Sequence, residues 1–226
     1  MNLTYFGHSC FLLETSKAKI LFDPFISENE LAKEIDVDTI ECDYVFVSHG
    51  HFDHVADAER ILKRTGAKLV SSFEIVSWFE KKGIKDGHPM NIGGSWKFDF
   101  GWIKYVEAVH SSVLPDGTYG GQPGGWILEA DEKVLYYAGD TALHMNMQLI
   151  GERYKLNWAI LPIGDNFTMG PIDAARAADL VKCQHVIGMH YDTFGYIKID
   201  KEKVKNIFAK TRKNITLMEI GATKAL

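Results

Sequence analysis

Residues 49–54 of the chain read His-Gly-His-Phe-Asp-His, so three imidazoles and one carboxylate fall within six residues. Neutral imidazole is the commonest metal ligand among side chains, and a carboxylate adds a hard anionic oxygen suited to a second divalent cation. Along an extended backbone, alternate side chains point to the same side, which places His49 and His51 together. The chain then turns, and Asp53 and His54 can face a neighbouring position. The spacing predicts a metal site.

Two simpler interpretations compete with a metal site. A surface loop can carry several histidines by chance, and Asp53 could act as the N-cap of a helix that follows it. Either would explain a single histidine. Neither explains the whole cluster well, because so many polar groups next to a buried strand are costly unless something binds them.

The elements on either side predict where the cluster lies. Residues 43–47, Asp-Tyr-Val-Phe-Val, read as a short buried strand. A helix is expected over Val55–Arg64, with Gly66 suited to the position after its last turn. The cluster therefore occupies a strand-to-helix turn, where α/β proteins place their ligand sites.

Three further candidate ligands follow apolar strands later in the chain. They are His110 after the expected strand Ile103–Ala108, Asp140 after Lys133–Ala138, and His190 after Val186–Met189. Five histidines and two aspartates are enough for two metal ions with open positions for water and substrate. The full set of metal candidates is His49, His51, Asp53, His54, His110, Asp140 and His190.

Strands and helices are expected along the whole chain. The remaining strands are predicted at Leu3–Phe6, Cys10–Glu14, Lys19–Phe22, Leu69–Val70, Trp96–Phe100, Trp126–Ala130, Trp158–Leu161 and Ile215–Glu219. Helices are predicted at Glu74–Lys82, Ile172–Val181 and Lys201–Ala209, with a short helix or lid at Ser27–Glu34. Residues 115–125 hold five glycines and two prolines, which predicts a loop beside the site.

Composition limits the class of protein. With 226 residues and 46% hydrophobic content, we expect one globular domain over residues 1–226. The net charge is −5 and the basic residues are dispersed, which argues against nucleic acid as a partner. No apolar run approaches the roughly 18 residues of a membrane span, and we expect no secretory signal, because no basic and apolar leader pattern precedes the first strand. Three cysteines without CxxC spacing suit a reducing compartment, so we expect a cytoplasmic protein.

The order and spacing of the motifs resemble the metallo-β-lactamase superfamily over nearly the whole chain. Three further segments resemble a subgroup of uncharacterised metal-dependent hydrolases that is similar to the ascorbate-6-phosphate lactonase branch. They are Gly7-His8-Ser9, Asp23-Pro24-Phe25 and residues 161–170, Leu-Pro-Ile-Gly-Asp-Asn-Phe-Thr-Met-Gly. The resemblance implies an α/β (α+β) fold, a four-layer αββα sandwich with the site along one edge of the paired sheets.

The resemblance also assigns the ligands. It implies that His49, His51 and His110 hold one cation, that Asp53, His54 and His190 hold the other, and that Asp140 bridges the two. Two divalent cations can share a hydroxide at neutral pH, because metal binding lowers the pKa of water from 15.7 to roughly 7. We therefore expect a small carbonyl or phosphoryl substrate, such as a lactone, ester or phosphodiester, to be hydrolysed without a serine or cysteine nucleophile. Imidazole-rich ligation favours zinc, with Mn, Fe or Ni as alternatives.

Two residues are candidates for catalytic roles. By analogy, Asp53 would orient the hydroxide or carry a proton to the leaving group. His8 would lie near the metal edge, where it either contacts substrate or acts as a general acid, or else is a hydrogen-bonded structural histidine. Structural roles are expected for His88 and His185, while His144 is left undecided. Phe167 and Met169 are candidates to line a substrate pocket.

Three other functions are weighed against hydrolysis of a small molecule. An iron-centred redox protein of the same fold usually wants a carboxylate where this chain has His51. A nuclease or phosphodiesterase acting on nucleic acid would need a basic surface. A purely structural zinc site would be a closed tetrahedron, which seven candidate ligands exceed. Hydrolysis is therefore preferred, and a homo-oligomer is left open.

Overall fold

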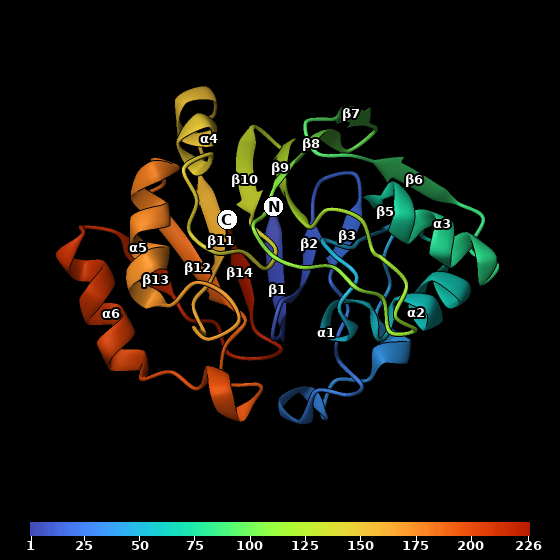
Figure 1. Ribbon diagram of the computed structural model, residues 1–226, viewed down its shortest axis with the longest axis horizontal. Coiled ribbons are helices and arrows are strands. Elements are labelled where there is room, and N and C mark those ends of the chain that lie inside the picture. The colour runs from blue at the N-terminus through green and yellow to red at the C-terminus, as the bar shows by residue number, and fades with distance from the viewer.

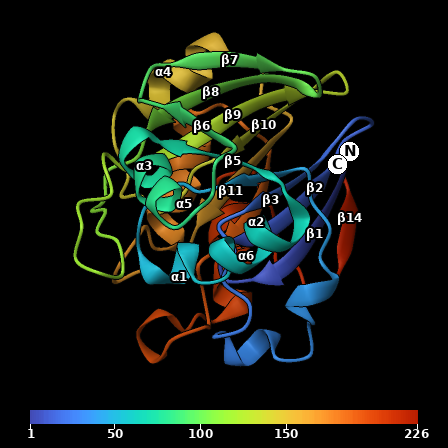
Figure 2. The ribbon, with the colours of Figure 1, turned by 90° about the vertical axis from the view of Figure 1, so that its right-hand side faces the viewer.

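The computed structural model describes residues 1–226 and consists of two seven-stranded mixed sheets packed face to face. Helices cover the outer face of each sheet, so the layers run helix, sheet, sheet, helix (Figure 1). Turned by 90°, the molecule shows α2 and α3 in front of the first sheet (Figure 2). This is the predicted four-layer αββα sandwich. No helix combines the length and apolar character needed to span a bilayer.

The first sheet has the strand order β14-β1-β2-β3-β4-β5-β6. The pairs from β14 through β1 and β2 to β3 are antiparallel, whereas the pairs from β3 to β6 are parallel. Its strands are β1 (Asn2–Gly7), β2 (Cys10–Glu14), β3 (Lys19–Phe22), β4 (Tyr44–Phe46), β5 (Lys68–Ser72), β6 (Gly87–Met90) and β14 (Thr223–Ala225). Its helical segments are η1 (Glu30–Ala32), η2 (Val37–Thr39), α1 (Phe52–Val55), α2 (Ala58–Thr65) and α3 (Phe73–Lys81).

The second sheet has the order β13-β12-β11-β10-β9-β8-β7. Strands β7 to β10 are antiparallel and β10 to β13 are parallel. Its strands are β7 (Ser95–Phe98), β8 (Gly101–Glu107), β9 (Gly124–Ala130), β10 (Lys133–Tyr137), β11 (Trp158–Pro162), β12 (His185–Met189) and β13 (Asn214–Thr216). Its helical segments are α4 (Met147–Arg153), α5 (Pro171–Leu180), η3 (Gly195–Ile197) and α6 (Lys201–Lys210).

Aromatic side chains join the two sheets. Phe22 of β3 stacks on Tyr137 of β10 with ring centroids 4.7 Å apart, and Phe46 of β4 meets Trp126 of β9 at 5.0 Å. These residues belong to a cluster of 43 buried side chains that extends beneath α5. A second cluster of 22 buried side chains packs α2 and α3 against the first sheet. Because apolar side chains are buried on both faces of each sheet, the polar residues that follow the strands lie at the edge of the sandwich.

The helix predicted over Val55–Arg64 is divided. Helix α1 ends at Val55 and α2 begins at Ala58. Between them, the carboxylate of Asp57 accepts hydrogen bonds from the backbone N–H groups of Ile26 at 2.7 Å and Ser27 at 2.9 Å. Asp57 therefore holds the loop after β3 against the segment between α1 and α2. The helical spacing of apolar residues does not predict a long-range contact of this kind.

Other differences lie at the sheet margins. Strand β6 contains Pro89 and was not predicted, yet it is an edge strand, where a missing N–H is tolerated. The last predicted strand is shorter and ends at Thr216, after which the chain crosses to pair with β1 as β14. Helix α4 was also missed, while the lid region at Ser27–Glu34 contains only the single turn η1. The glycine-rich loop ends two residues early, because Gly124 and Gly125 begin β9.

Candidate metal centre

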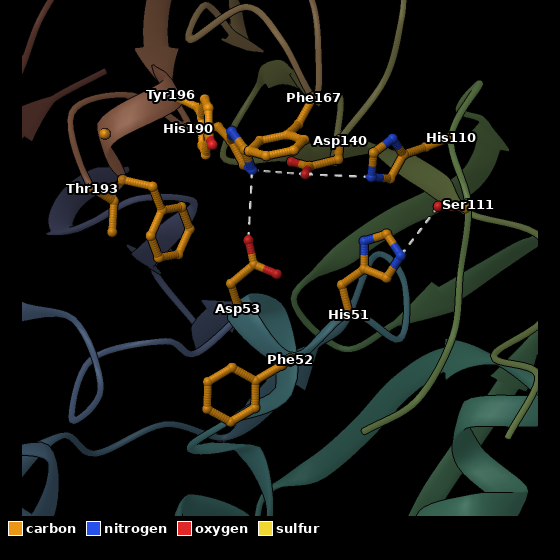
Figure 3. Close-up of a pocket in the computed structure, with 12 residues that line it drawn as sticks. His51, Phe52, Asp53, His110, Ser111, Asp140, Phe167, His190, Thr193 and Tyr196 are labelled. Carbon is orange, nitrogen blue, oxygen red and sulfur yellow. Dashed lines mark hydrogen bonds and ion pairs between the residues drawn. The ribbon is translucent and has the colours of Figure 1, made fainter. Parts of the chain in front are cut away.

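The ends of four strands bring all seven predicted metal candidates to one edge of the sandwich. Residues 49–54 follow β4 and enter α1, and the three other candidates follow β8, β10 and β12. Figure 3 shows His51, Asp53, His110, Asp140 and His190 facing a common space. Because the carboxyl ends of parallel strands meet at one edge of a sheet, residues up to 141 positions apart in sequence become neighbours here.

The first group consists of His49, His51 and His110. One ring nitrogen from each lies within 4.8 Å of the others. Nε2 of His49 and Nδ1 of His51 are 3.0 Å apart. His49 is fully buried, while His51 and His110 border the open side of the site. Burial lowers the pKa of all three imidazoles, so they are neutral and able to act as ligands at pH 7.

The second group consists of His8, Asp53, His54 and His190, whose ligand atoms also lie within 4.8 Å of one another. Oδ2 of Asp53 lies 2.9 Å from Nε2 of His8, 3.7 Å from Nε2 of His190 and 3.8 Å from Nε2 of His54. Asp53 and His54 come from α1, and His190 follows β12 with a left-handed backbone, φ 56°. The group includes the three second-cation candidates and adds His8.

Asp140 lies between the two groups. Its Oδ2 atom is 2.9 Å from Nε2 of His190, 3.3 Å from Nε2 of His54 and 3.7 Å from Nε2 of His110. One buried carboxylate oxygen therefore contacts imidazoles of both groups. Burial alone would raise the pKa of Asp140, but His190 and His54 outweigh it and hold the pKa well below the usual range.

Asp23 supports the centre and had been given no role from the sequence. It is fully buried at the end of β3, and its Oδ2 lies 2.8 Å from Nδ1 of His54. It also accepts hydrogen bonds from Ser48 N–H at 2.7 Å and from the Tyr137 hydroxyl at 2.6 Å. A carboxylate can only accept, so Nδ1 of His54 carries a proton and Nε2 faces the centre. The one sequence signal was the segment Asp23-Pro24-Phe25.

Ser48 orients His49 in a similar way. Its hydroxyl donates to Oδ2 of Asp23 at 2.6 Å and accepts from Nδ1 of His49 at 3.0 Å. The opposite ring nitrogen of His49 therefore presents its lone pair to His51. Partners of this kind fix both the tautomer and the direction of a ligand imidazole.

The charge distribution of the second group differs from that of the first. Burial works to lower the pKa of His54 and His190, yet the carboxylates outweigh it. Asp140, Asp23 and Asp53 raise the pKa of His54 well above its usual value, and Asp140 and Asp53 raise the pKa of His190 to about 9. The site thus has a strong local preference for positive charge, which protons supply in the absence of metal.

The residues present fit divalent cations. Nε2 of His54 and Oδ1 of Asp140 are buried without a hydrogen-bond partner. Buried polar atoms are nearly always paired, so these two indicate a missing electrophilic partner. Oxygen and imidazole nitrogen are the donors that zinc and similar ions accept.

His8 is buried beside the centre. Its Nε2 lies 2.9 Å from Asp53 Oδ2 and its Nδ1 lies 3.0 Å from Oγ1 of Thr193. Burial, aided by His190, lowers its pKa to about 4, so the imidazole is neutral at pH 7. His8 does not line the neighbouring cavity.

The other histidines lie outside both groups. His88 packs against Trp96 and Phe98, His185 packs against Trp158, and Nδ1 of His144 lies 3.8 Å from Glu107. None of the three lines the cavity at the centre.

A cavity of 750 Å³ opens beside the centre. Apart from candidate ligands and Gly195, it is lined by Phe52, Ser111, Phe167, Thr193, Phe194 and Tyr196. Phe167 lines it as expected. Met169 does not, because its side chain is buried in the core while its backbone N–H donates to Thr141 O at 3.0 Å.

The family model of the beta-lactamase superfamily domain matches residues 2–190, a span that contains all seven metal candidates. The chain belongs to the metallo-β-lactamase superfamily. Within it, this superfamily member is 50% identical over 222 residues to a UPF0173 metal-dependent hydrolase of Christiangramia forsetii, covering 98% of each chain. It is 54% identical over 208 residues to a UPF0173 metal-dependent hydrolase of Methylacidiphilum infernorum, covering 92% of each.

A solved structure extends the likeness to three dimensions. Igni18, described as a novel metallo hydrolase from the archaeon Ignicoccus hospitalis, superposes on this metallo-β-lactamase superfamily member with a TM-score of 0.89. The two chains are 39% identical, and the match covers 99% of this chain and 97% of Igni18. The recognised superfamily, its metal-dependent hydrolase subgroup and the sandwich fold are thereby confirmed.

Proposed function

We propose that the protein is a dinuclear metal-dependent hydrolase acting on a small carbonyl or phosphoryl substrate. The observation that carries the proposal is the position of Asp140, whose single Oδ2 atom lies within 3.7 Å of imidazole nitrogens from both groups. A carboxylate in that position suits a ligand shared by two cations. A lone cation would leave one group of donors without a partner.

The ligands divide as the two groups do. His49, His51 and His110 would hold one cation, Asp53, His54 and His190 would hold the other, and Asp140 would contact both. The first set is all imidazole, which favours zinc over the oxygen-rich ligation suited to redox iron, with Mn, Fe or Ni as alternatives. When bound, two such ions would lower the pKa of water toward 7 and polarise the carbonyl or phosphoryl oxygen of the substrate.

Asp53 and His8 act as a pair in this proposal. The Asp53 carboxylate can only accept, and a neutral imidazole carries one N–H, so Nε2 of His8 donates to Asp53 and Nδ1 accepts from Thr193. His8 therefore fixes Asp53 in its orientation, as a positioning residue. Asp53, which reaches the cavity, remains the candidate to orient water or to carry a proton to the leaving group.

Metal analysis with one substitution tests the proposal. We expect wild-type protein to bind two divalent ions per chain and to hydrolyse at least one member of a panel of esters, lactones, thioesters and phosphodiesters. Asp140→Ala should lose both metal and turnover, while Asp99→Asn, at an exposed position, should keep both. Retention of two metals by Asp140→Ala would contradict the bridging role.

A further inference from the structure

Aromatic side chains gather around the cavity beside the candidate centre. The chain has seven exposed aromatic side chains, and four of them line this one cavity. They are Phe52, Phe167, Phe194 and Tyr196. Exposed apolar side chains scattered singly need no explanation, but a group of them around a cavity marks a binding site.

The aromatic residues form two walls. Phe167, from the loop after β11, meets Tyr196 of η3 edge to face at 6.2 Å. Phe52 of α1 and Phe194 both contact Phe25, at 5.9 Å and 6.1 Å. Figure 3 shows Phe167 and Tyr196 on the side of His190, and Phe52 across the space beneath Asp53.

The wall formed by Phe52 and Phe194 packs on a buried aromatic side chain. Phe25 is only 1% exposed and contacts His8 edge to face at 5.4 Å. Phe52 and Phe194 therefore pack against the buried ring of Phe25, which in turn packs against His8 of the second group. A wall built in this way is largely formed before a ligand arrives, which limits the ordering cost of binding.

The cavity has no fixed positive charge beyond the centre itself. No lysine or arginine lines it. Sites that select phosphate or carboxylate groups usually present these residues, since they pair with such anions and stabilise phosphoryl transfer. The two carboxylates that line the cavity, Asp53 and Asp140, are already engaged with imidazoles, which leaves none for a cationic group.

We propose that the substrate is an uncharged carboxylic ester or lactone whose acyl part is apolar and is held between the Phe167–Tyr196 wall and the Phe52–Phe194 wall. The inference rests on the proposed hydrolase function and narrows it. In the reaction, water adds its oxygen to the carbonyl carbon and the bond from that carbon to the ester oxygen breaks. The products are a carboxylate, an alcohol and one proton.

Methyl esters test the acyl preference because they share one small leaving group. Methyl acetate, butyrate and hexanoate vary apolar length, and methyl phenylacetate adds a flat ring. Monomethyl adipate matches the length of methyl hexanoate but ends in a carboxylate. We expect kcat/KM of the metal-loaded protein to rise about threefold to fourfold per methylene until the cavity is filled. Monomethyl adipate should fall more than about tenfold below methyl hexanoate, because its charge would have to be desolvated without a partner.

Two substitutions test whether the Phe167–Tyr196 wall causes the preference for an apolar acyl part. Phe167→Ala and Tyr196→Ala should lower kcat/KM for methyl hexanoate and methyl phenylacetate by about tenfold, with little change for methyl acetate and no change in metal content. Phe73→Ala is the matched control, since Phe73 is also exposed but lies on α3 and does not line the cavity.

A binding measurement without turnover complements the kinetics. N-methyl-2-phenylacetamide is a neutral amide that resists hydrolysis and presents the same ring. Saturation-transfer NMR should show transfer to its phenyl protons with wild type and with Phe73→Ala, and loss of that transfer with a Phe167→Ala and Tyr196→Ala double variant. Transfer that is unchanged in the double variant would overturn the assigned wall.

The outcomes separate this inference from the proposed function. Equal or better turnover of monomethyl adipate, of a trimethylammonium-tipped ester or of bis(p-nitrophenyl) phosphate would overturn the apolar, neutral substrate while leaving a metal-dependent hydrolase. Failure of the metal-loaded protein to hydrolyse any ester, lactone, thioester or phosphodiester would refute the hydrolase function, and the substrate inference with it.

Discussion

Asp23 holds the imidazole of His54 through a 2.8 Å contact between Oδ2 and Nδ1, and both side chains are fully buried. The pair links the end of β3 to α1, two elements that are separated in sequence by η1, η2 and β4. The contact at Nδ1 directs Nε2 of His54 toward Asp140. The geometry of the candidate centre therefore depends on a residue that does not itself face the cavity.

Asp23→Asn should weaken metal binding. An amide nitrogen cannot accept a hydrogen bond, so the donors from His54, Ser48 and Tyr137 can no longer all be satisfied. We expect metal affinity to fall by about 10- to 100-fold. The free energy of unfolding should fall by about 1–3 kcal/mol. Chelator competition and urea titration measure the two effects.

The control for this change is Tyr137→Phe. It removes one donor to Asp23 but leaves the contact with His54 in place, so stability should fall while metal affinity stays close to wild type. Equal losses of affinity in both variants would show that the buried network acts as a whole and that the contact with His54 has no special part.

His8 should affect turnover more than metal retention. Its backbone is left-handed, φ 55°, a conformation that asparagine tolerates better than alanine. His8→Asn therefore preserves the turn and shortens the side chain, so that it cannot span Asp53 and Thr193. We expect two bound metals, near-native thermal stability and a kcat lowered by about 10- to 100-fold.

His8→Ala separates backbone strain from side-chain function. It should show the same loss of kcat as His8→Asn together with an added stability loss of about 0.5–1 kcal/mol, because histidine and asparagine adopt the left-handed backbone several-fold more often than alanine does. Unchanged kcat in both variants, with metal content confirmed, would remove His8 from the mechanism.

Much of the fold and of the candidate site follows from local patterns. His110, Asp140 and His190 each follow an apolar strand closely, and the cluster at residues 49–54 follows another, so strand prediction already indicates a common edge for them. The hydrogen bonds that orient the ligands do not follow from such local patterns. Asp23 is 31 residues from His54, and His8 is 45 residues from Asp53, and both contacts exist only once the strands are ordered in the sheet.

The wall formed by Phe52 and Phe194 is even harder to predict from the sequence. Both residues contact Phe25, and although Phe52 begins the short helix α1, Phe25 and Phe194 lie in loops whose paths depend on tertiary contacts. Asp57, which divides the predicted helix, is a similar case, because an aspartate beside a helix reads as a surface cap until its partner loop is known. Local propensity predicts elements well and the contacts between loops poorly.

The metal-free protein should lose stability as pH rises above neutrality. Burial alone would lower the pKa of His190, but Asp140 and Asp53 raise it to about 9 in the folded state, compared with roughly 6.5 in an unfolded chain. The folded state thus binds this proton more tightly. Its stabilising contribution is complete below about pH 6.5 and is lost as pH rises through about 9. Urea unfolding of the metal-free protein should show this slope, and His190→Asn should reduce it, leaving the part that comes from His54, whose pKa is also raised.

Metal uptake should be linked to the same proton. A cation must displace the proton from His190 before it can use that nitrogen, so affinity should rise with pH up to about 9. Calorimetry at pH 7 in two buffers with different ionisation enthalpies should reveal proton release on Zn²⁺ binding. An apparent enthalpy that does not depend on the buffer would contradict the linkage.

Gly139 should be essential for the placement of Asp140. Its backbone is left-handed, φ 62°, and a Cβ at this position would lie 2.6 Å from the carbonyl oxygen of Gly124. That oxygen belongs to the backbone of β9 and cannot move aside cheaply, so Gly139→Ala must shift the turn that carries Asp140. The matched control is Gly117→Ala, where φ is 85° but nothing lies within 4 Å of the added atom. We expect Gly117→Ala to cost about 1 kcal/mol of stability from the backbone alone. Gly139→Ala should cost about 3 kcal/mol or more and should lower metal content as well. Equal stability losses with full metal content in both variants would show that the turn before Asp140 can relax, and that the close approach of β9 does not fix the ligand.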